Sequence, residues 1–454
     1  MSPEKQPITT RRALPAFTVA WLLVALAAPS LLAQALPRAT RPEEVGLSSE
    51  RLQRLTDAFQ GYVKDGKLSG AVVLVARRGK VAYLGAFGQR DVEAHAPMKE
   101  DAIFRIASQS KALVSVAAMR LQEEGKLLIS DPVGKYIPEF QKTKVAVLRP
   151  GGYDVVDAKR PITIRDLLTH TSGVSYGHGP AEALWEKAGI QDWYFADRDE
   201  PVAATVTRMA ALPFDAQPGE KYIYGYSTDI LGVVVERASG QTLDEYLRAQ
   251  VLEPLKMRDT HFYLPPAKVD RLAAVYSATD DGRIERAPTP GRMAGQGAYV
   301  EGPRKSFSGG AGLLSTASDY ARFLQMMLSG GELDGARVLG RKTVELMTVN
   351  HLPAALDTGD GTGFGLGFSV VKDVGRRGQP GSVGEFGWGG AYHSTYWVDP
   401  QEQLVVVYFT QLLPAKNLDD HAKLRALVYS AIVDGVPAPA PRPNPRPAAA
   451  AATR

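Results

Sequence analysis

The chain has 454 residues, of which 44% are hydrophobic, so it can bury a large core and exceeds the size at which one core stops growing; we expect two subdomains. It contains no cysteine, which excludes a disulfide framework, a cysteine nucleophile and a thiolate metal site. The net charge of +4 comes mainly from basic residues near the two ends, so the composition indicates no nucleic-acid-binding surface.

The first 35 residues have the pattern of an export signal. Three basic residues, Lys5, Arg11 and Arg12, precede an uncharged stretch from residue 13 to 33. Ala33-Gln34-Ala35 then supplies the small residues of a cleavage site, which predicts a signal peptide at 1–35 and a periplasmic or secreted protein. A retained membrane anchor is the alternative, because the stretch is about long enough to span a bilayer.

Residues 36–435 are predicted to form the folded domain, in which strands and helices mix. In chain order the expected elements are a hairpin at 70–84, a helix from 108 to about 125, helices at 163–169, 227–240 and 242–251, strands at 364–371, 391–398 and 404–409, and a helix at 420–433. Residues 131–228, with many turns, are expected to be a helical or irregular insertion beside a cleft. Strands at both ends with helices between them predict an α+β fold. The Pro, Ala and Arg composition of residues 436–454 predicts a disordered tail.

Ser108-Gln109-Ser110-Lys111 stands at the start of the first long predicted helix, and the pattern is typical of an activated serine. Residues three apart lie on one face of a helix, so the Lys111 amine can reach the Ser108 hydroxyl. A serine must lose its proton to a base during attack, and a lysine whose pKa is lowered by desolvation or nearby cations can take part. Helix capping by Ser108 is the alternative for this motif taken alone.

Two later stretches favour the catalytic interpretation. One contains Tyr224 within residues 222–232, and the other is Trp388-Gly389-Gly390-Ala391, ahead of a predicted strand. Together with Ser-x-x-Lys they resemble the serine β-lactamase and penicillin-binding-protein superfamily, and more narrowly class C β-lactamases, family VIII carboxylesterases and D-aminopeptidases. The resemblance covers about residues 45–433. It implies a β-lactamase/transpeptidase-like fold, with an antiparallel sheet flanked by helices and a mainly helical subdomain.

The resemblance also implies a role for each motif. Ser108 matches the acylated nucleophile and Lys111 its partner. Tyr224 matches the tyrosine that, beside a protonated lysine, takes the serine proton. We prefer Tyr224 to Tyr226 because the esterase branch places this tyrosine eight residues before the glycine of an Asp-Val-Leu-Gly-like run, here Asp-Ile-Leu-Gly at 229–232.

Two departures from the lactamase pattern bear on the substrate. Tyr226 stands where lactamases have Asn, and Trp388-Gly389-Gly390 replaces their Lys-Thr-Gly. A tryptophan offers no cation to a β-lactam carboxylate and suits a neutral ester. The glycines let an acyl oxygen approach the strand, and the backbone N–H groups of the nucleophile and of Ala391 would form the oxyanion hole.

The sequence therefore predicts an exported serine hydrolase that cleaves short-chain esters, with weak β-lactam hydrolysis allowed. A D-amino-acid peptidase or amidase, or a class C β-lactamase, is the alternative enzyme. A penicillin-binding module that is acylated without turnover is the alternative of another class. The expected partners are small esters, amides or β-lactams, with no nucleic acid, metal or cofactor, and a membrane only if the N-terminal segment is retained.

Other residues of catalytic type are expected to be structural. Gly173-Val174-Ser175-Tyr176-Gly177 spells the Gly-x-Ser-x-Gly of α/β-hydrolases, which needs a strand before it and a helix after it. The preceding residues are expected to be helical, so we interpret this stretch as a glycine-rich turn. His170 and His393 have no obvious carboxylate partner in the sequence, and no metal-ligand spacing occurs.

Overall fold

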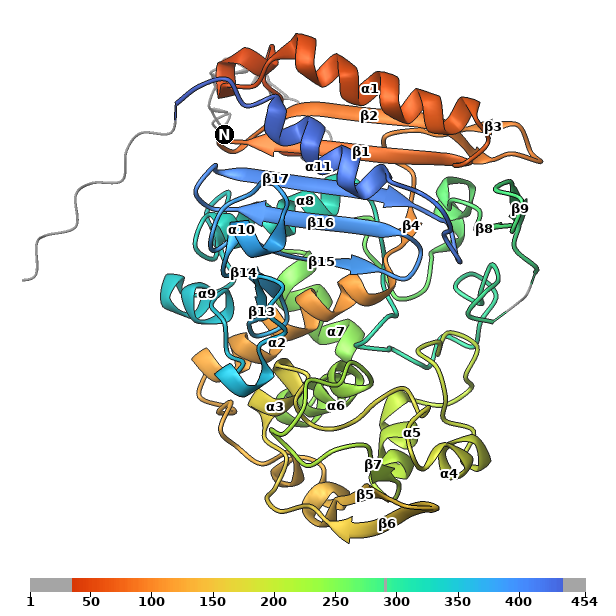
Figure 1. The fold of residues 1–454 in the computed structure, drawn as a ribbon, viewed down its shortest axis with the longest axis vertical. Coiled ribbons are helices and arrows are strands. Elements are labelled where there is room, and N and C mark those ends of the chain that lie inside the picture. The colour runs from red at the N-terminus through yellow and green to blue at the C-terminus, as the bar shows by residue number, and fades with distance from the viewer. Residues whose placement is uncertain (1–34, 290–291, 436–454) are drawn as a thin grey trace, which may run out of the picture. The chain divides into compact units, whose positions relative to one another are not determined.

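The computed structural model describes residues 35–289 and 292–435, so the predicted tail and all but the last residue of the predicted signal lie outside it. An eight-stranded antiparallel sheet has the order β13-β14-β15-β16-β17-β1-β2-β3 (Figure 1). Its strands are β1 (Gly70–Arg77), β2 (Lys80–Asp91), β3 (Ala96–Pro97), β13 (Thr362–Phe364), β14 (Ser369–Val371), β15 (Phe386–Gly390), β16 (Ser394–Asp399) and β17 (Leu404–Thr410). Because β1 pairs with β17, the two ends of the folded chain meet in the middle of the sheet.

The central strand β1 forms where the sequence predicts a hairpin. Its run of Val, Leu and Ala is buried on both faces of the sheet, and the β-branched valines favour the strand conformation. Arg78 and Gly79 both have positive φ, +53° and +76°, which is the geometry of a tight two-residue turn into β2. Val72 and Leu74 point into one core and the alternating Val73 and Val75 into another.

Helices cover both faces of this sheet. On one face α1 (Ser49–Lys64) lies alongside α11 (Asp420–Ser430), as Figure 1 shows. Their apolar side chains, including Phe59 and Leu424, share the core of Val73 and Val75. On the other face α8 (Ala317–Leu328) packs against β1, β16 and β17. The sheet is therefore the middle layer, and the predicted α+β architecture is confirmed.

A second group of helices surrounds α2 (Ser110–Glu123), which is buried along almost its whole length and packs against α6 (Ser227–Ser239). The other helices are α3 (Ile164–Leu168), α4 (Glu182–Lys187), α5 (Val202–Met209), α7 (Leu243–Leu247), η5 (Arg248–Leu252, a π-helix), α9 (Arg341–Met347) and α10 (Val374–Arg377). Short 3-10 helices are η1 (Pro42–Val45), η2 (Ala107–Gln109), η3 (Val133–Lys135), η4 (Pro138–Lys142), η6 (Pro266–Arg271) and η7 (Ala354–Leu356). Among these described helices, none is both long and apolar enough to cross a bilayer.

The smaller sheets join short strands. They are β4 (Phe104–Arg105) with β10 (Leu314–Ser315), β8 (Tyr276–Ala278) with β9 (Ile284–Arg286), β11 (Glu332–Leu333) with β12 (Ala336–Arg337), and β5 (Lys144–Arg149) between β6 (Gly152–Asp157) and β7 (Pro213–Phe214). This last sheet corrects the expectation that residues 131–228 are only helical or irregular. Valine-rich stretches on either side of Pro150 and Gly151 form a β-hairpin there, because Gly151 adopts a positive φ of +84° in the turn.

Two strands near the C-terminal end also differ from expectation. The strand predicted at 364–371 is a hairpin of β13 and β14, because Gly367, with φ of +93°, turns the chain. The strand predicted at 391–398 begins only at Ser394, because His393 has φ of +64° and belongs to a turn. The preceding Trp388-Gly389-Gly390 therefore lies inside a strand of its own, β15.

Candidate active site

Ser108 lies in η2, the turn of 3-10 helix that leads into α2. Ala107 just before it has φ of +41°, a left-handed conformation that costs a non-glycine residue about 1–2 kcal/mol. Ala107 and Gln109 are fully buried, whereas Ser108 is half-buried. A rigid, buried backbone thus holds the serine hydroxyl at an accessible position, as a nucleophile requires.

The Lys111 amine reaches the Ser108 hydroxyl, as the helical spacing predicts. Lys111 Nζ lies 3.3 Å from Ser108 Oγ, with the lysine side chain almost fully buried. The amine also donates to the hydroxyl oxygen of Tyr176 at 3.0 Å and to the carbonyl of Gly310 at 2.8 Å. Three oxygens therefore surround this amine, an arrangement that suits a cation.

The pKa of Lys111 depends on two opposing effects. Burial favours the neutral amine, but Tyr176, Tyr224 and Asp229 together outweigh it and raise the pKa above the ordinary value of a lysine. The amine is therefore protonated at neutral pH. A protonated lysine cannot itself accept the serine proton, so another group must act as the base.

Tyr224, and not Tyr226, lies beside this lysine. The Lys111 Nζ atom is 4.6 Å from the centroid of the Tyr224 ring. Tyr226 is fully buried, and its hydroxyl donates to the backbone carbonyl of Asp192 at 2.5 Å. The two tyrosines share the loop and first turn before α6 but face different surroundings, which favours Tyr224 as the catalytic candidate.

Strand β15 brings the third motif to the same place. Trp388 Nε1 donates to the Tyr224 hydroxyl oxygen at 3.1 Å, and the two ring centroids are 5.4 Å apart. A Cβ atom on Gly390 would lie 2.6 Å from the carbonyl oxygen of Ile106, so only glycine allows β15 to approach the segment before the nucleophile. Ala391 follows directly and is half-buried, and the resemblance assigns its backbone N–H to the oxyanion hole.

Tyr176, Asp229 and Gly310 also lie at the Lys111 site, although their positions there were not predicted from the sequence. Burial raises the pKa of Tyr176 despite the opposing effect of Lys111. Asp229 Oδ1 accepts from Ser308 Oγ at 2.6 Å and from the Gly310 N–H at 3.0 Å, which fixes the peptide that binds the lysine. In the sequence, Tyr176 is marked only by its place next to Ser175 in the Gly-x-Ser-x-Gly stretch. Gly310 is marked only by the glycine-rich run at 309–312.

The residues expected to be structural have ordinary contacts. Ser175 follows α3 and a loop rather than a strand, and its hydroxyl accepts from the Gly177 N–H at 3.2 Å. His170 is buried with its ring 4.6 Å from that of Tyr224, and burial lowers its pKa far below the ordinary value, so it is neutral. His393 does have a carboxylate partner, Asp420, at 2.8 Å.

A cavity of about 520 Å³ opens beside these motifs. The aromatic residues Tyr222, Phe364 and Trp388 line it together with the loop residues Leu352 and Pro353. Trp388 thus lines the cavity and also contacts Tyr224. A group bound in the cavity therefore lies next to Tyr224, the candidate base.

Comparison with known proteins shows the family and supports the fold. The family model described as Beta-lactamase matches residues 55–430. Esterase EstB of Burkholderia gladioli is 34% identical over 79% of this chain and 89% of its own length, and the lovastatin esterase of Penicillium rubens is 29% identical over 76% and 89%. The solved structure of EstCE1, a hydrolase with promiscuous acyltransferase activity, has a TM-score of 0.73 and 30% identity, covering 84% of this chain and 98% of that one.

The fold and the serine site define a serine hydrolase with the β-lactamase/transpeptidase-like fold. The chain belongs to the beta-lactamase family of serine hydrolases.

Proposed function

We propose that the protein hydrolyses esters of short acids through an acyl-enzyme on Ser108. One observation carries the proposal: the Ser108 hydroxyl lies against a protonated Lys111, while Trp388 stands beside the adjacent Tyr224 where lactamases present a lysine. Esterases among the relatives support it.

In the proposed reaction, Ser108 Oγ attacks the ester carbonyl carbon as its proton passes to the oxygen of Tyr224, which acts in its phenolate form. The N–H groups of Ser108 and Ala391 stabilise the resulting oxyanion; each such donor contributes roughly 3 to 4 kcal/mol in acyl transfer. The intermediate collapses, the C–O bond to the alcohol breaks, and the alcohol leaves with the proton from the tyrosine. Water then attacks the acyl-enzyme by the same route, releasing the acid and restoring the serine.

The cation of Lys111 and the indole N–H of Trp388 have supporting roles in these steps. Both groups stabilise the phenolate form of Tyr224, which accepts the serine proton and is restored when the alcohol takes that proton away. Because Lys111 keeps its proton, we assign it an electrostatic role rather than that of the base.

The surroundings of Trp388 favour a neutral ester over a carboxylate-bearing β-lactam. The cavity beside it is lined by aromatic and aliphatic side chains that can hold an apolar acyl or alcohol group. A lysine also lines this cavity, but Lys372 forms an ion pair with Asp357 at 2.9 Å, so its charge is already compensated. Binding a substrate carboxylate there would require breaking that pair.

Steady-state rates on p-nitrophenyl butyrate and benzylpenicillin test the proposal. We expect kcat/KM for the ester to exceed that for the penicillin by at least about a hundredfold, which corresponds to ~2.7 kcal/mol of transition-state binding. Ser108→Ala should abolish ester hydrolysis, whereas Ser175→Ala, the matched control, should retain it. Penicillin turnover as fast as ester turnover would favour a lactamase, and a long-lived penicillin adduct without ester turnover would favour a penicillin-binding module. Turnover of D-amino-acid amides in place of both substrates would favour a peptidase.

The location that we propose, periplasmic or secreted, rests on the signal predicted at residues 1–35. The sequence allows a retained membrane anchor as the alternative. Cell fractionation with an antibody to the folded domain separates the two, because a cleaved enzyme is recovered without membranes and an anchored one sediments with them.

A further inference from the structure

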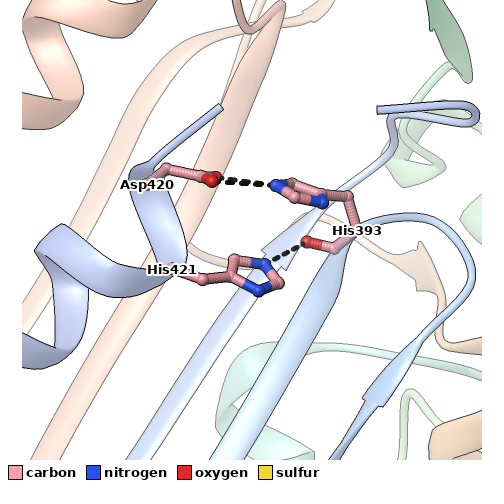
Figure 2. Close-up of side chains that lie close together, drawn as sticks. All are labelled: His393, Asp420 and His421. Carbon is pink, nitrogen blue, oxygen red and sulfur yellow. Dashed lines mark hydrogen bonds and ion pairs between the residues drawn. The ribbon is translucent and has the colours of Figure 1, made fainter. Parts of the chain in front are cut away.

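His393, Asp420 and His421 meet where α11 begins beside the turn between β15 and β16 (Figure 2). His393 Nε2 lies 2.8 Å from Asp420 Oδ1, and the two imidazole rings stack with their centroids 4.1 Å apart. One potential ligand atom from each residue lies within 4.8 Å of the other two. We propose that these three residues bind a divalent transition-metal ion of the zinc class.

The ligand set agrees with this choice of metal. Two imidazole nitrogens and one carboxylate oxygen suit Zn²⁺ and its neighbours, whereas Ca²⁺ and Mg²⁺ prefer oxygen ligands only. Metal–ligand bonds of about 2.1 Å in a tetrahedral site place the ligand atoms about 3.4 Å apart. Rotation of the half-buried imidazoles can close the remaining difference, and a water molecule can supply the fourth ligand.

Surrounding contacts already orient the three side chains. Asp420 is fully buried, and its Oδ2 atom accepts from the Tyr408 hydroxyl at 2.6 Å, while Oδ1 faces His393. His421 Nε2 lies 3.1 Å from the backbone carbonyl of His393. Such outer hydrogen bonds typically hold the ligands of metal sites in place. The His393 side chain keeps 18% of its surface exposed and His421 is also partly exposed, so an ion can reach them from solvent.

The backbone at His393 is consistent with a role for its side chain. Its φ of +64° lies in the left-handed region, which residues other than glycine seldom adopt, although histidine does so more often than most. The position nevertheless carries an imidazole that points to Asp420. A bound ion would tie this turn, which begins at Ala391, to the first residues of α11.

A plain hydrogen-bonded His–Asp pair is the competing explanation, and it makes a different demand on the third residue. The pair requires only His393 and Asp420, whereas the metal site also requires His421. Calorimetric titration of Zn²⁺ into the full chain without an affinity tag therefore separates the two. We expect one Zn²⁺ per chain, a rise in Tm with Zn²⁺, and an affinity at least about tenfold weaker in His421→Ala.

His178→Ala is the matched control. His178 also contacts two carboxylates, Glu182 and Asp192, but through opposite ring nitrogens, so the three cannot share one ion. Its replacement should leave Zn²⁺ affinity unchanged. The proposal is overturned if the wild type shows no saturable Zn²⁺ binding, or if His421→Ala binds Zn²⁺ as the wild type does.

A second measurement needs no variant and applies even if His421→Ala does not fold. Diethylpyrocarbonate modifies accessible imidazoles, and mass spectrometry locates the modified residues. Zn²⁺ should slow the modification of His393 and His421 in the wild type by at least about tenfold and leave that of His178 unchanged. Equal effects of Zn²⁺ on all three histidines, or no effect on His393 and His421, would contradict the site.

Discussion

Replacing Tyr224 by Phe removes one hydroxyl from the active site and leaves the ring. The ring contacts with His170 and Trp388, whose ring centroids lie 4.6 and 5.4 Å from that of Tyr224, are retained, so the fold should not change. The lost hydroxyl is the acceptor of the Trp388 N–H, whose removal costs about 1 kcal/mol of stability because the indole is half-buried and water can replace the partner.

The expected effect on catalysis is much larger. A positioned general base contributes about 10²- to 10⁴-fold to the rate, which is roughly 2.7 to 5.5 kcal/mol of barrier. Lys111 cannot replace the tyrosine, because its raised pKa keeps it protonated. We therefore expect kcat for p-nitrophenyl butyrate to fall at least about a hundredfold in Tyr224→Phe, with Tm nearly unchanged.

Two neighbouring tyrosines provide the controls for this measurement. Tyr226→Phe loses only the hydrogen bond to the Asp192 carbonyl, so it should lower stability by about 1 kcal/mol and leave kcat within a few-fold. Tyr176→Phe loses a contact with Lys111 and should be intermediate. The assignment of the base would be refuted if Tyr224→Phe kept more than a tenth of the wild-type kcat, or if either control were the more severe variant.

Two further predictions concern substrate choice and pH. Trp388→Lys restores a cation at the position where lactamases have one, so the ratio of ester to benzylpenicillin kcat/KM should narrow; an unchanged or wider ratio would contradict our account of Trp388. Burial and Lys268 lower the pKa of His261 to about 4, from 6.5 in the unfolded chain. The unfolded state therefore binds a proton first as the pH falls, and stability should decrease between about pH 6.5 and pH 4 by about 3 kcal/mol from this group. His261→Gln should flatten that part of the profile in denaturant titrations, and an identical slope in the variant would show that other groups are responsible.

Much of the fold follows from local patterns. The β1–β2 hairpin is encoded by a β-branched run and the turn at Arg78 and Gly79, and α6 begins and ends where its residues indicate. The predicted secondary structure was wrong where glycines determine how the chain turns. Gly151, with Pro150, makes a hairpin turn inside the segment expected to be helical or irregular, and Gly367 divides an expected strand. A glycine permits several conformations, and the packing around it selects one.

Some contacts in the candidate site could be predicted from the sequence, and others could not. The contact between Ser108 and Lys111 depends only on helix geometry, because the two residues are three apart. Tyr224 and Trp388 were identified through resemblance, and only the structure shows that the indole donates to the tyrosine oxygen. The direction of the Lys111 pKa could not be read from the sequence, because desolvation lowers it and the surrounding groups, which the sequence does not place, raise it.

The sequence by itself thus determined the family, the order of the main elements and the contact between Ser108 and Lys111, which we propose as nucleophile and partner, because these depend on spacing along the chain. The tertiary structure alone decided which groups surround the lysine: Tyr176 is 65 residues away in the sequence and Gly310 is 199. It likewise brought His393 to Asp420, 27 residues further on. No local rule relates residues so far apart, since their contact depends on how the sheet and the helices pack as a whole.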